Sequence, residues 1–202
     1  KLALITQFEK YFGSHSATVL QKTFRYNNSI AETTGKFVMQ NPEQYIKKIE
    51  AHHQVKQSQV FLVETNKRDI NESISQVVNT IKANDPSGSI ALLARYRYLL
   101  HGSKGLEADY CILIGLSGGS RGFPNVTHED SVLDALLPQA DSFRYSEERR
   151  LFYVAMTRAK KKVYLIADLI TPSEFISELL SVNYDLQIVP KQPLIQTDEI
   201  QS

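Results

Sequence analysis

Three short segments concentrate arginine, lysine and glycine at places where strands are expected to end or begin. They are Thr23–Asn28 (TFRYNN), His101–Asp109 (HGSKGLEAD) and Glu147–Ala159 (EERRLFYVAMTRA). The third lies in a basic stretch, because residues 144–162 hold seven Arg or Lys against two Glu, a net charge of +5. Guanidinium and ammonium groups form strong hydrogen bonds to phosphate oxygens. These segments are therefore the candidates for contact with a phosphate-bearing ligand.

A complete phosphate-binding loop is missing from the sequence. A Walker A loop needs the pattern G-x-x-x-x-G-K-[ST], whose backbone amides and lysine hold the phosphates. The one Gly-Lys pair is Gly35-Lys36, and Ile30 and Phe37 occupy the positions of the first Gly and of the Ser or Thr. The glycines of Gly118–Gly122 do not fit the dinucleotide pattern G-x-G-x-x-G either.

Other catalytic patterns are equally thin. The five histidines are scattered, and His52-His53 has no carboxylate at a ligand-like spacing of four residues. Cys111 lies in an apolar run, where a thiol usually behaves as a small inert hydrophobe. Asp168 follows an apolar strand as in a Walker B motif, but no second acid comes after it, so we expect it merely to end the strand. By its own residues, the chain is not a complete hydrolase.

Composition suits one large or two small domains with an ordinary core. The 202 residues are 42% hydrophobic and 22% charged, with a net charge of +1. A single cysteine excludes a disulfide framework, and no run of 18 apolar residues could span a membrane. Without a signal segment at its start, the chain is expected in the cytoplasm. Total charge alone does not indicate a nucleic-acid partner.

The elements that must position these segments alternate between β-branched runs and longer amphipathic stretches. This order is typical of an α/β domain with a mostly parallel sheet flanked by helices. We expect one domain over residues 1–190 and a loosely ordered polar tail over 191–202. The expected strands are Ala17–Gln21, Gln59–Val63, Ile90–Ala94, Tyr110–Gly115 and Val163–Ala167. The expected helices are Leu2–Phe12, Ser29–Gln40, Ile70–Ala83, Glu129–Leu137, Ser146–Thr157 and Ser173–Leu180.

Taken together and in order, the three basic segments closely resemble motifs IV, V and VI of the UvrD-like superfamily 1 DNA helicases. The core Y-V-[AG]-x-T-R-A of the third motif is present as Tyr153–Ala159. The resemblance runs from about Leu4 to Leu180, and within the family it is strongest to the DNA helicase IV branch. It implies a RecA-like fold of the P-loop NTPase type, here the second helicase domain without its own Walker A loop.

The same resemblance implies a function and its partners. In that family ATP and Mg²⁺ bind between two RecA-like domains, and the N-terminal one carries both Walker motifs. This chain would then need the N-terminal RecA-like domain of the same protein, and single-stranded or duplex DNA, as partners, with translocation from 3′ to 5′. Alone it would be inactive. The alternative is a non-catalytic RecA-like module that binds nucleic acid or protein.

Motif matching also implies roles for single residues. Arg25 and Arg158 correspond to arginine fingers on the γ-phosphate of ATP, although each could be a surface arginine in a salt bridge. Phe24 occupies the position of a Tyr that stacks on adenine, and its alternative is a core phenylalanine. Glu107 matches the acid that binds the ribose of ATP.

The loop of the second motif is the implied contact to single-stranded DNA, with a plain solvated turn as the alternative. Its residues are His101, Gly102, Ser103 and Lys104. Relatives carry a longer segment before this loop, so we expect that a stretch of chain is missing between Leu100 and His101.

Four further expectations concern the surroundings of these residues. Arg95 is left open between DNA, nucleotide and structure. One of Arg149 and Arg150 is expected to pair with a nearby acid, and Lys160–Lys162 to form an exposed turn. Because parallel sheets place their ligand crevice at the carboxyl ends of the strands, we expect Arg25, Glu107 and Arg158 together at that edge.

Overall fold

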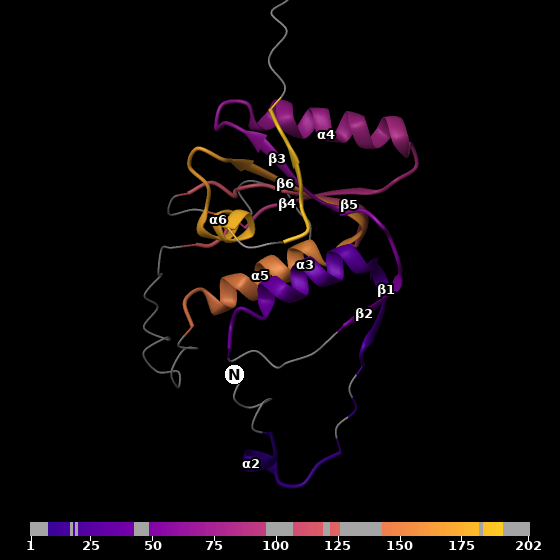
Figure 1. Cartoon of the computed structure of the whole chain (residues 1–202), viewed down its shortest axis with the longest axis vertical. Coiled ribbons are helices and arrows are strands. Elements are labelled where there is room, and N and C mark those ends of the chain that lie inside the picture. The colour runs from indigo at the N-terminus through magenta and orange to yellow at the C-terminus, as the bar shows by residue number, and fades with distance from the viewer. Residues whose placement is uncertain are drawn as a thin grey trace, which may run out of the picture.

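The computed structural model describes residues 8–16, 18, 20–42, 49–95, 107–118, 122–125, 143–181 and 184–191. Its centre is a sheet of five strands, all parallel, in the order β4-β5-β6-β3-β7 (Figure 1). The strands are β3 (Val60–Thr65), β4 (Ile90–Leu93), β5 (Ala108–Leu113), β6 (Ala159–Asp168) and β7 (Gln187–Val189). The mostly parallel α/β fold is therefore confirmed.

The two faces of the sheet follow the side-chain alternation of its central strand. Val163 and Leu165 of β6 point to one hydrophobic cluster, and Tyr164 and Ile166 point to the other. Strands covered on both faces read as nearly continuous apolar runs, which is why they could be predicted from sequence.

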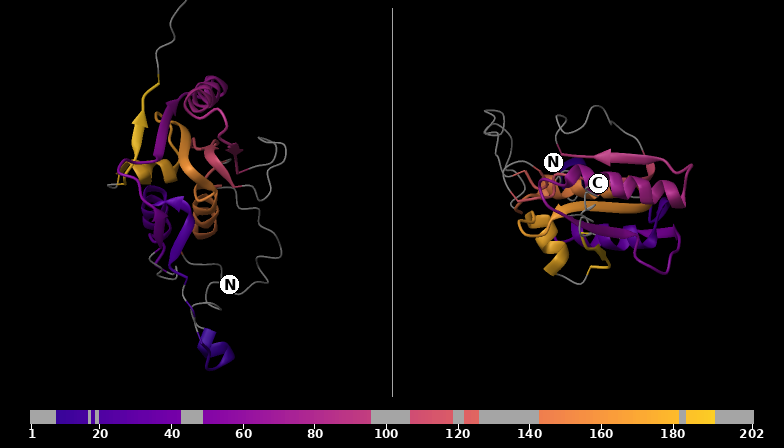
Figure 2. Two further views of the ribbon diagram at one scale, coloured as in Figure 1. Left: turned by 90° about the vertical axis from the view of Figure 1, so that its right-hand side faces the viewer. Right: turned by 90° about the horizontal axis from the view of Figure 1, so that it is seen from above.

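Helices cover both faces of the sheet (Figures 1 and 2). One face packs against α4 (Ile70–Asn84), whose residues Val77 and Ile81 join the cluster of Tyr164 and Ile166. The other face packs against α3 (Asn28–Val38), α5 (Ser146–Met156) and α6 (Glu174–Ser181). The short helix α2 (Phe8–Phe12) buries none of its residues and extends away from the sheet (Figure 1).

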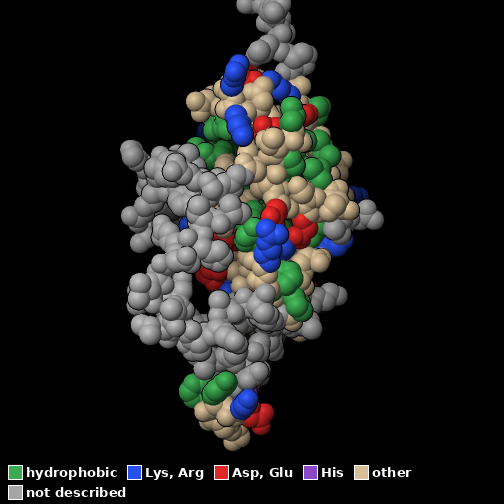
Figure 3. Space-filling model, turned by 90° about the vertical axis from the view of Figure 1, so that its left-hand side faces the viewer, with side chains coloured by type: hydrophobic (Ala, Val, Ile, Leu, Met, Phe, Trp, Pro, Cys, Tyr) green, Lys and Arg blue, Asp and Glu red, His purple; other side chains and the backbone are tan. Residues whose placement is uncertain are grey.

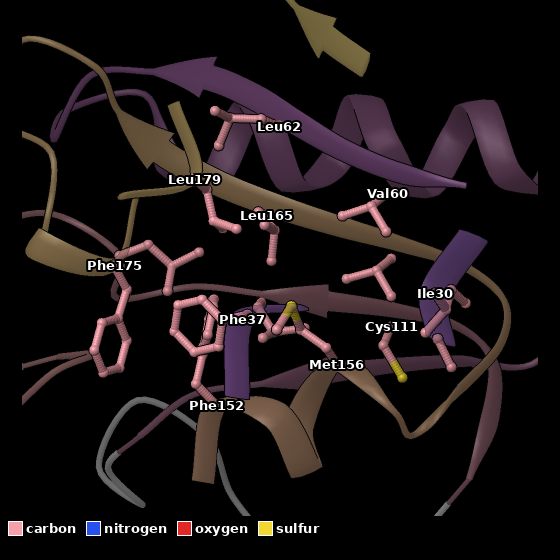
Figure 4. Packing of buried hydrophobic residues seen from close by; sticks show 14 of the residues in the cluster. Ile30, Phe37, Val60, Leu62, Cys111, Phe152, Met156, Leu165, Phe175 and Leu179 are labelled. Atoms are coloured by element: carbon pink, nitrogen blue, oxygen red, sulfur yellow. The ribbon is translucent and has the colours of Figure 1, made fainter. Parts of the chain in front are cut away.

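Three aromatic rings form the centre of the larger cluster (Figure 4). Phe37 of α3, Phe152 of α5 and Phe175 of α6 have ring centroids 5.1 to 5.5 Å apart, and all three rings are buried. Aromatic pairs at such distances add roughly 0.5–1.5 kcal/mol each beyond the area that they bury. This contact fixes α3, α5 and α6 relative to one another.

A second, smaller sheet carries the first motif. Strand β1 (Lys22–Asn27) pairs in parallel with β2 (Glu50–His53) and is separate from the main sheet. The chain then enters α3, whose first turn is capped because the side chain of Asn27 accepts a hydrogen bond from the amide of Ile30 at 3.2 Å.

Most predicted elements are confirmed within a few residues, two predictions need correction, and two strands were not predicted. The strand expected over residues 17–21 is instead β1, further along the chain. Strand β6 begins at Ala159, so Lys160–Lys162 form its start rather than an exposed turn. Strands β2 and β7 were not predicted, because each is short and β2 buries only Ala51. The helix expected over Glu129–Leu137 lies outside the described residues.

Within the described ranges, none of the helices is both long enough and apolar enough to cross a membrane.

Candidate functional site

The candidate residues Glu107, Arg158 and Arg25 meet at one corner of the domain. Glu107 directly precedes β5, and Arg158 lies between α5 and β6. Their backbones are adjacent, because the amide of Ala108 donates to the carbonyl oxygen of Arg158 at 3.2 Å. Arg25 of β1 reaches this corner from the smaller sheet, with its Nε 2.7 Å from Oε1 of Glu107. The structure thus places the two side chains of Arg25 and Glu107 in contact and the backbone of Arg158 beside them.

The edge of the sheet on which they lie was predicted wrongly. Glu107 and Arg158 stand where β5 and β6 begin, so the corner is at the amino ends of the strands (right in Figure 1). The rule that ligands bind at the carboxyl ends describes sheets whose own loops after the strands form the crevice. Here the charged groups come from segments that lead into strands, which necessarily places them at the opposite edge.

Both charged groups of the Arg25–Glu107 pair are accessible to solvent. The side chain of Arg25 is 50% exposed and that of Glu107 is 37% exposed. An ion pair in such a setting contributes about 0–1 kcal/mol to stability. In this structure Arg25 is therefore a surface arginine in a salt bridge, as the alternative interpretation describes. Because that salt bridge is weak, a ligand with more negative charge could compete for Arg25.

Two tyrosines hold β1 against α5 beside this pair. Tyr26 is buried, and Tyr153 of α5 shares a hydrogen bond with it. Burial, and secondarily this hydrogen bond, raises the pKa of the Tyr153 hydroxyl, while the nearby charge of Arg25 acts in the opposite direction. The Tyr153 hydroxyl therefore stays protonated, and its hydrogen bond with Tyr26 fixes the strand that carries Arg25 on the helix that leads to Arg158.

Phe24 is a surface ring, so the alternative of a core phenylalanine is wrong. Its side chain is 64% exposed, and its centroid lies 4.8 Å from that of His52 on β2. The ammonium group of Lys22 lies 5.6 Å from the same ring. An open groove of about 350 Å³ runs along β1 and includes Phe24 and Arg25 in its lining. An exposed ring next to a guanidinium suits a nucleotide, whose base can stack while its phosphates pair.

Sequence analysis missed His52 as a neighbour of Phe24. The two rings meet only because β1 and β2 pair in parallel, with Thr23 opposite Ala51. The apolar pattern of the sequence gives no signal for this pairing.

Arg149 has a structural role. Its guanidinium binds both carboxylate oxygens of Glu178 at 2.8 and 2.7 Å and the carbonyl oxygen of Phe37 at 3.0 Å. It also lies 4.3 Å from the centre of the Phe37 ring. The neighbouring Arg150 pairs with Glu147 at 2.8 Å. The expectation that one of these arginines pairs with an acid is met by both.

Arg95 lies at the other end of the sheet, after β4. Its Nε donates to both carboxylate oxygens of Glu148 at 2.9 and 3.0 Å. The same carboxylate accepts a hydrogen bond from the amide of Asn125 at 3.1 Å. Of the three roles left open for Arg95, this geometry supports the structural one.

Asp168 and Cys111 behave as the sequence predicts. Burial raises the pKa of the Asp168 carboxyl, but hydrogen bonds from the amides of Ile170 and Thr171 and from the Thr171 hydroxyl outweigh it, so that the pKa is lowered. Asp168 thus ends β6 by forming a turn. Burial raises the pKa of the Cys111 thiol to about 12, which keeps it protonated and unreactive.

The implied DNA loop, His101, Gly102, Ser103 and Lys104, lies outside the described residues, as does the junction of Leu100 and His101. Over the ranges that are described, no three His, Cys, Asp or Glu side chains gather as a metal ion would need. On the side of the domain opposite the corner, basic, acidic and hydrophobic side chains are interspersed over the described surface (Figure 3).

The family model and the relatives that match this chain are all DNA helicases or helicase domains. The family model described as "UvrD-like helicase C-terminal domain" matches residues 98–169, which include Glu107 and Arg158. DNA helicase IV of Escherichia coli (strain K12) is 32% identical over 212 aligned positions, covering 95% of this chain. The chain spans only 30% of the length of that relative. A solved structure, the C-terminal domain of a possible DNA helicase from Lactobacillus plantarum WCFS1, aligns over 82% of this chain and 98% of its own, with 13% identity and a TM-score of 0.42.

Proposed function

Because this chain is a C-terminal domain of the UvrD-like helicase family, we propose that it serves as the second RecA-like motor domain of an ATP-dependent DNA helicase. In this proposal ATP binds between the corner of Arg25, Glu107 and Arg158 and an N-terminal RecA-like domain of the same protein. The observation that supports it is that Arg25 and Glu107 pair on a solvent-accessible corner, next to the backbone of Arg158, although the three residues are far apart in the sequence.

Each residue of the corner has a task that fits its setting. Phosphoryl transfer spreads negative charge over the γ-phosphate oxygens, and planar guanidinium groups stabilise that charge. Arg25 and Arg158 supply two such groups. Glu107 accepts hydrogen bonds from the ribose hydroxyls, and the exposed ring of Phe24 stacks on adenine.

Nucleotide binding would break the Arg25–Glu107 ion pair. In this proposal Arg25 binds the phosphates of ATP, and Glu107 binds its ribose. A half-exposed pair worth no more than about 1 kcal/mol can be separated at low cost when a triphosphate offers more charge. We therefore assign the ion pair to the nucleotide-free domain.

Mg²⁺ and the general base belong, in this proposal, to the N-terminal domain. When bound there, Mg²⁺ would neutralise negative charge that develops on the phosphates. The described part of this chain offers no cluster of carboxylates for it.

In the proposed cycle, ATP binding closes the two domains on each other, and hydrolysis lets them separate. The loop of His101–Lys104 binds single-stranded DNA during the 3′ to 5′ movement.

The test compares the isolated domain with the full-length protein that carries it. The 202-residue chain alone should have negligible ATPase activity. In the full-length protein, Arg25→Ala and Arg158→Ala should each lower kcat roughly 10³-fold, the scale of a lost arginine finger. Arg144→Ala is a matched control, because Arg144 is 73% exposed in the same basic stretch but pairs with Glu174.

Near-normal turnover of both finger variants would contradict the assignment, and robust turnover by the isolated chain would contradict the two-domain site. A full-length protein that binds DNA without any ATPase activity would favour the alternative of a non-catalytic binding module.

A further inference from the structure

Asn27 connects the strand that carries Arg25 with the strand that follows Arg158. It is the last residue of β1, two positions after Arg25, and is only 4% exposed. Its Nδ2 donates to the carbonyl oxygen of Lys161 at 2.9 Å and lies 3.5 Å from that of Lys160. These carbonyls belong to the start of β6, immediately after Arg158.

The side chain of Asn27 provides a connection between β1 and β6 that backbone pairing does not provide. Strands β1 and β6 belong to different sheets, so their backbones are not paired as neighbouring strands. The amide of Asn27 therefore fixes the end of β1 to the beginning of β6. With its oxygen it also accepts from the amide of Ile30 and so starts α3. One buried amide thus holds the strand of Arg25, the strand after Arg158 and the first turn of a core helix in a fixed relation.

We propose that Asn27 is a positioning residue for ATP hydrolysis, which sets the place of Arg25 relative to Arg158. This inference rests on the proposed function. Catalytic groups must lie close to their productive geometry, since a misplacement of about 1 Å can cost about 10²-fold in rate. Arg25 is half-exposed and its pair with Glu107 is weak, so its position depends on how firmly β1 is held.

The chemistry of the site requires an amide. An asparagine offers a donor and an acceptor on one planar group, whereas an aspartate offers acceptors only. Asn27→Asp keeps the acceptor for the amide of Ile30, which a carboxylate at a helix start serves well. It turns the other oxygen toward the carbonyls of Lys160 and Lys161, where two acceptors repel. This substitution therefore breaks the bridge to β6 and preserves the cap of α3.

The next residue provides a matched control. Asn28 is also an amide with two partners, since its Nδ2 donates to the carbonyl of Val55 at 3.3 Å and its Oδ1 accepts from the amide of Val55 at 2.7 Å. Its bridge leads to the segment after β2 and not to β6. Asn28→Asp thus removes a similar hydrogen bond without touching the connection between the two arginines.

The experiment measures kcat for ATP and the urea midpoint of unfolding in the full-length protein. We expect Asn27→Asp to lower kcat by about 10²-fold, and Asn28→Asp to keep kcat near that of the unmodified protein at a comparable loss of stability. Asn27→Ser, which keeps a cap acceptor but is too short to reach β6, should lower kcat as Asn27→Asp does. It replaces Asn27→Asp if the aspartate prevents folding.

A double-mutant cycle separates positioning from mere destabilisation. If Asn27 acts by placing Arg25, then Asn27→Asp should cause little further loss of kcat once Arg25 is already alanine. A loss that multiplies with that of Arg25→Ala, or equal losses for the variants of Asn27 and Asn28, would overturn the inference. Normal turnover of Arg25→Ala itself would instead contradict the proposed function, so the two failures are distinguishable.

Discussion

Two arginine–glutamate pairs in this domain have the same closest distance and opposite surroundings. Arg25 and Glu107 approach to 2.7 Å at the corner of the sheet, and Arg149 and Glu178 approach to 2.7 Å between α5 and α6. The first pair has side chains that are 50% and 37% exposed. The second has side chains that are 7% and 21% exposed, and its arginine lies among aromatic rings.

The difference teaches how to separate a structural arginine from one that can serve a ligand. Arg149 is held by two carboxylate oxygens, a backbone carbonyl and the ring of Phe37, so moving it would leave the largely buried carboxylate of Glu178 without its counter-charge. Arg25 has one solvent-screened partner.

The largest effect is expected from Arg149→Ala. Removing one partner of a buried ion pair usually costs about 3–5 kcal/mol, because the remaining charge stays desolvated. Arg25→Ala should change the free energy of unfolding by less than about 1 kcal/mol, since its pair is half-exposed. Urea unfolding of the 202-residue chain, followed by circular dichroism, measures both. A cost for Arg25→Ala equal to that of Arg149→Ala would break the comparison.

The main sheet could be predicted because its signals are local. The buried strand β5 reads as an apolar run, and α4 repeats its apolar residues with a helical period. The smaller sheet could not, because β2 is a four-residue strand with one buried side chain. Its existence depends on tertiary packing against β1 and α3, which no short window of sequence contains.

The proximity of three candidate residues could be predicted from sequence, whereas the edge of the sheet at which they lie could not. Motif matching selected Arg25, Glu107 and Arg158, and the structure brings them together. The edge was predicted wrongly because Glu107 and Arg158 precede their strands, whereas the general rule for parallel sheets concerns the loops that follow strands. The bridge from Asn27 to β6 spans more than 130 residues of sequence, so it could emerge only from the fold.

A smaller effect should appear in the coupling energies of the two pairs. In a double-mutant cycle, Arg25 and Glu107 should be coupled by about 0.2–1 kcal/mol, and raising the salt concentration should reduce that value. Coupling between Arg149 and Glu178 should be larger and nearly independent of salt, because solvent ions cannot approach a buried pair closely. The measurement is urea unfolding of the single and double alanine variants at low and high salt. Equal salt dependence would show that exposure does not separate the pairs.

The smallest effect concerns a third ion pair, which lies beside β5 and whose basic side chain is as exposed as that of Arg25. Lys161 approaches Asp85 to 2.7 Å, and the hydroxyl of Tyr110 donates to the same carboxylate oxygen at 3.0 Å. The side-chain hydrogen bonds from Lys161 and then from Tyr110 lower the pKa of the Asp85 carboxyl. A carboxyl whose pKa is lower in the folded than in the unfolded state stabilises the fold only while it is ionised.

The sign of the pH dependence follows from that shift. The contribution of Asp85 should be fully present above its unfolded pKa of about 3.9 and should be lost as the pH falls through its lower folded value. Asp85→Asn cannot ionise, so the variant should be slightly less stable than the unmodified chain at neutral pH, and the two should converge in the acid range. Urea midpoints measured from neutral pH down to acid unfolding test this. A difference that stays constant at every pH would mean that the Asp85 charge adds nothing to the fold and that its amide replacement acts through shape alone.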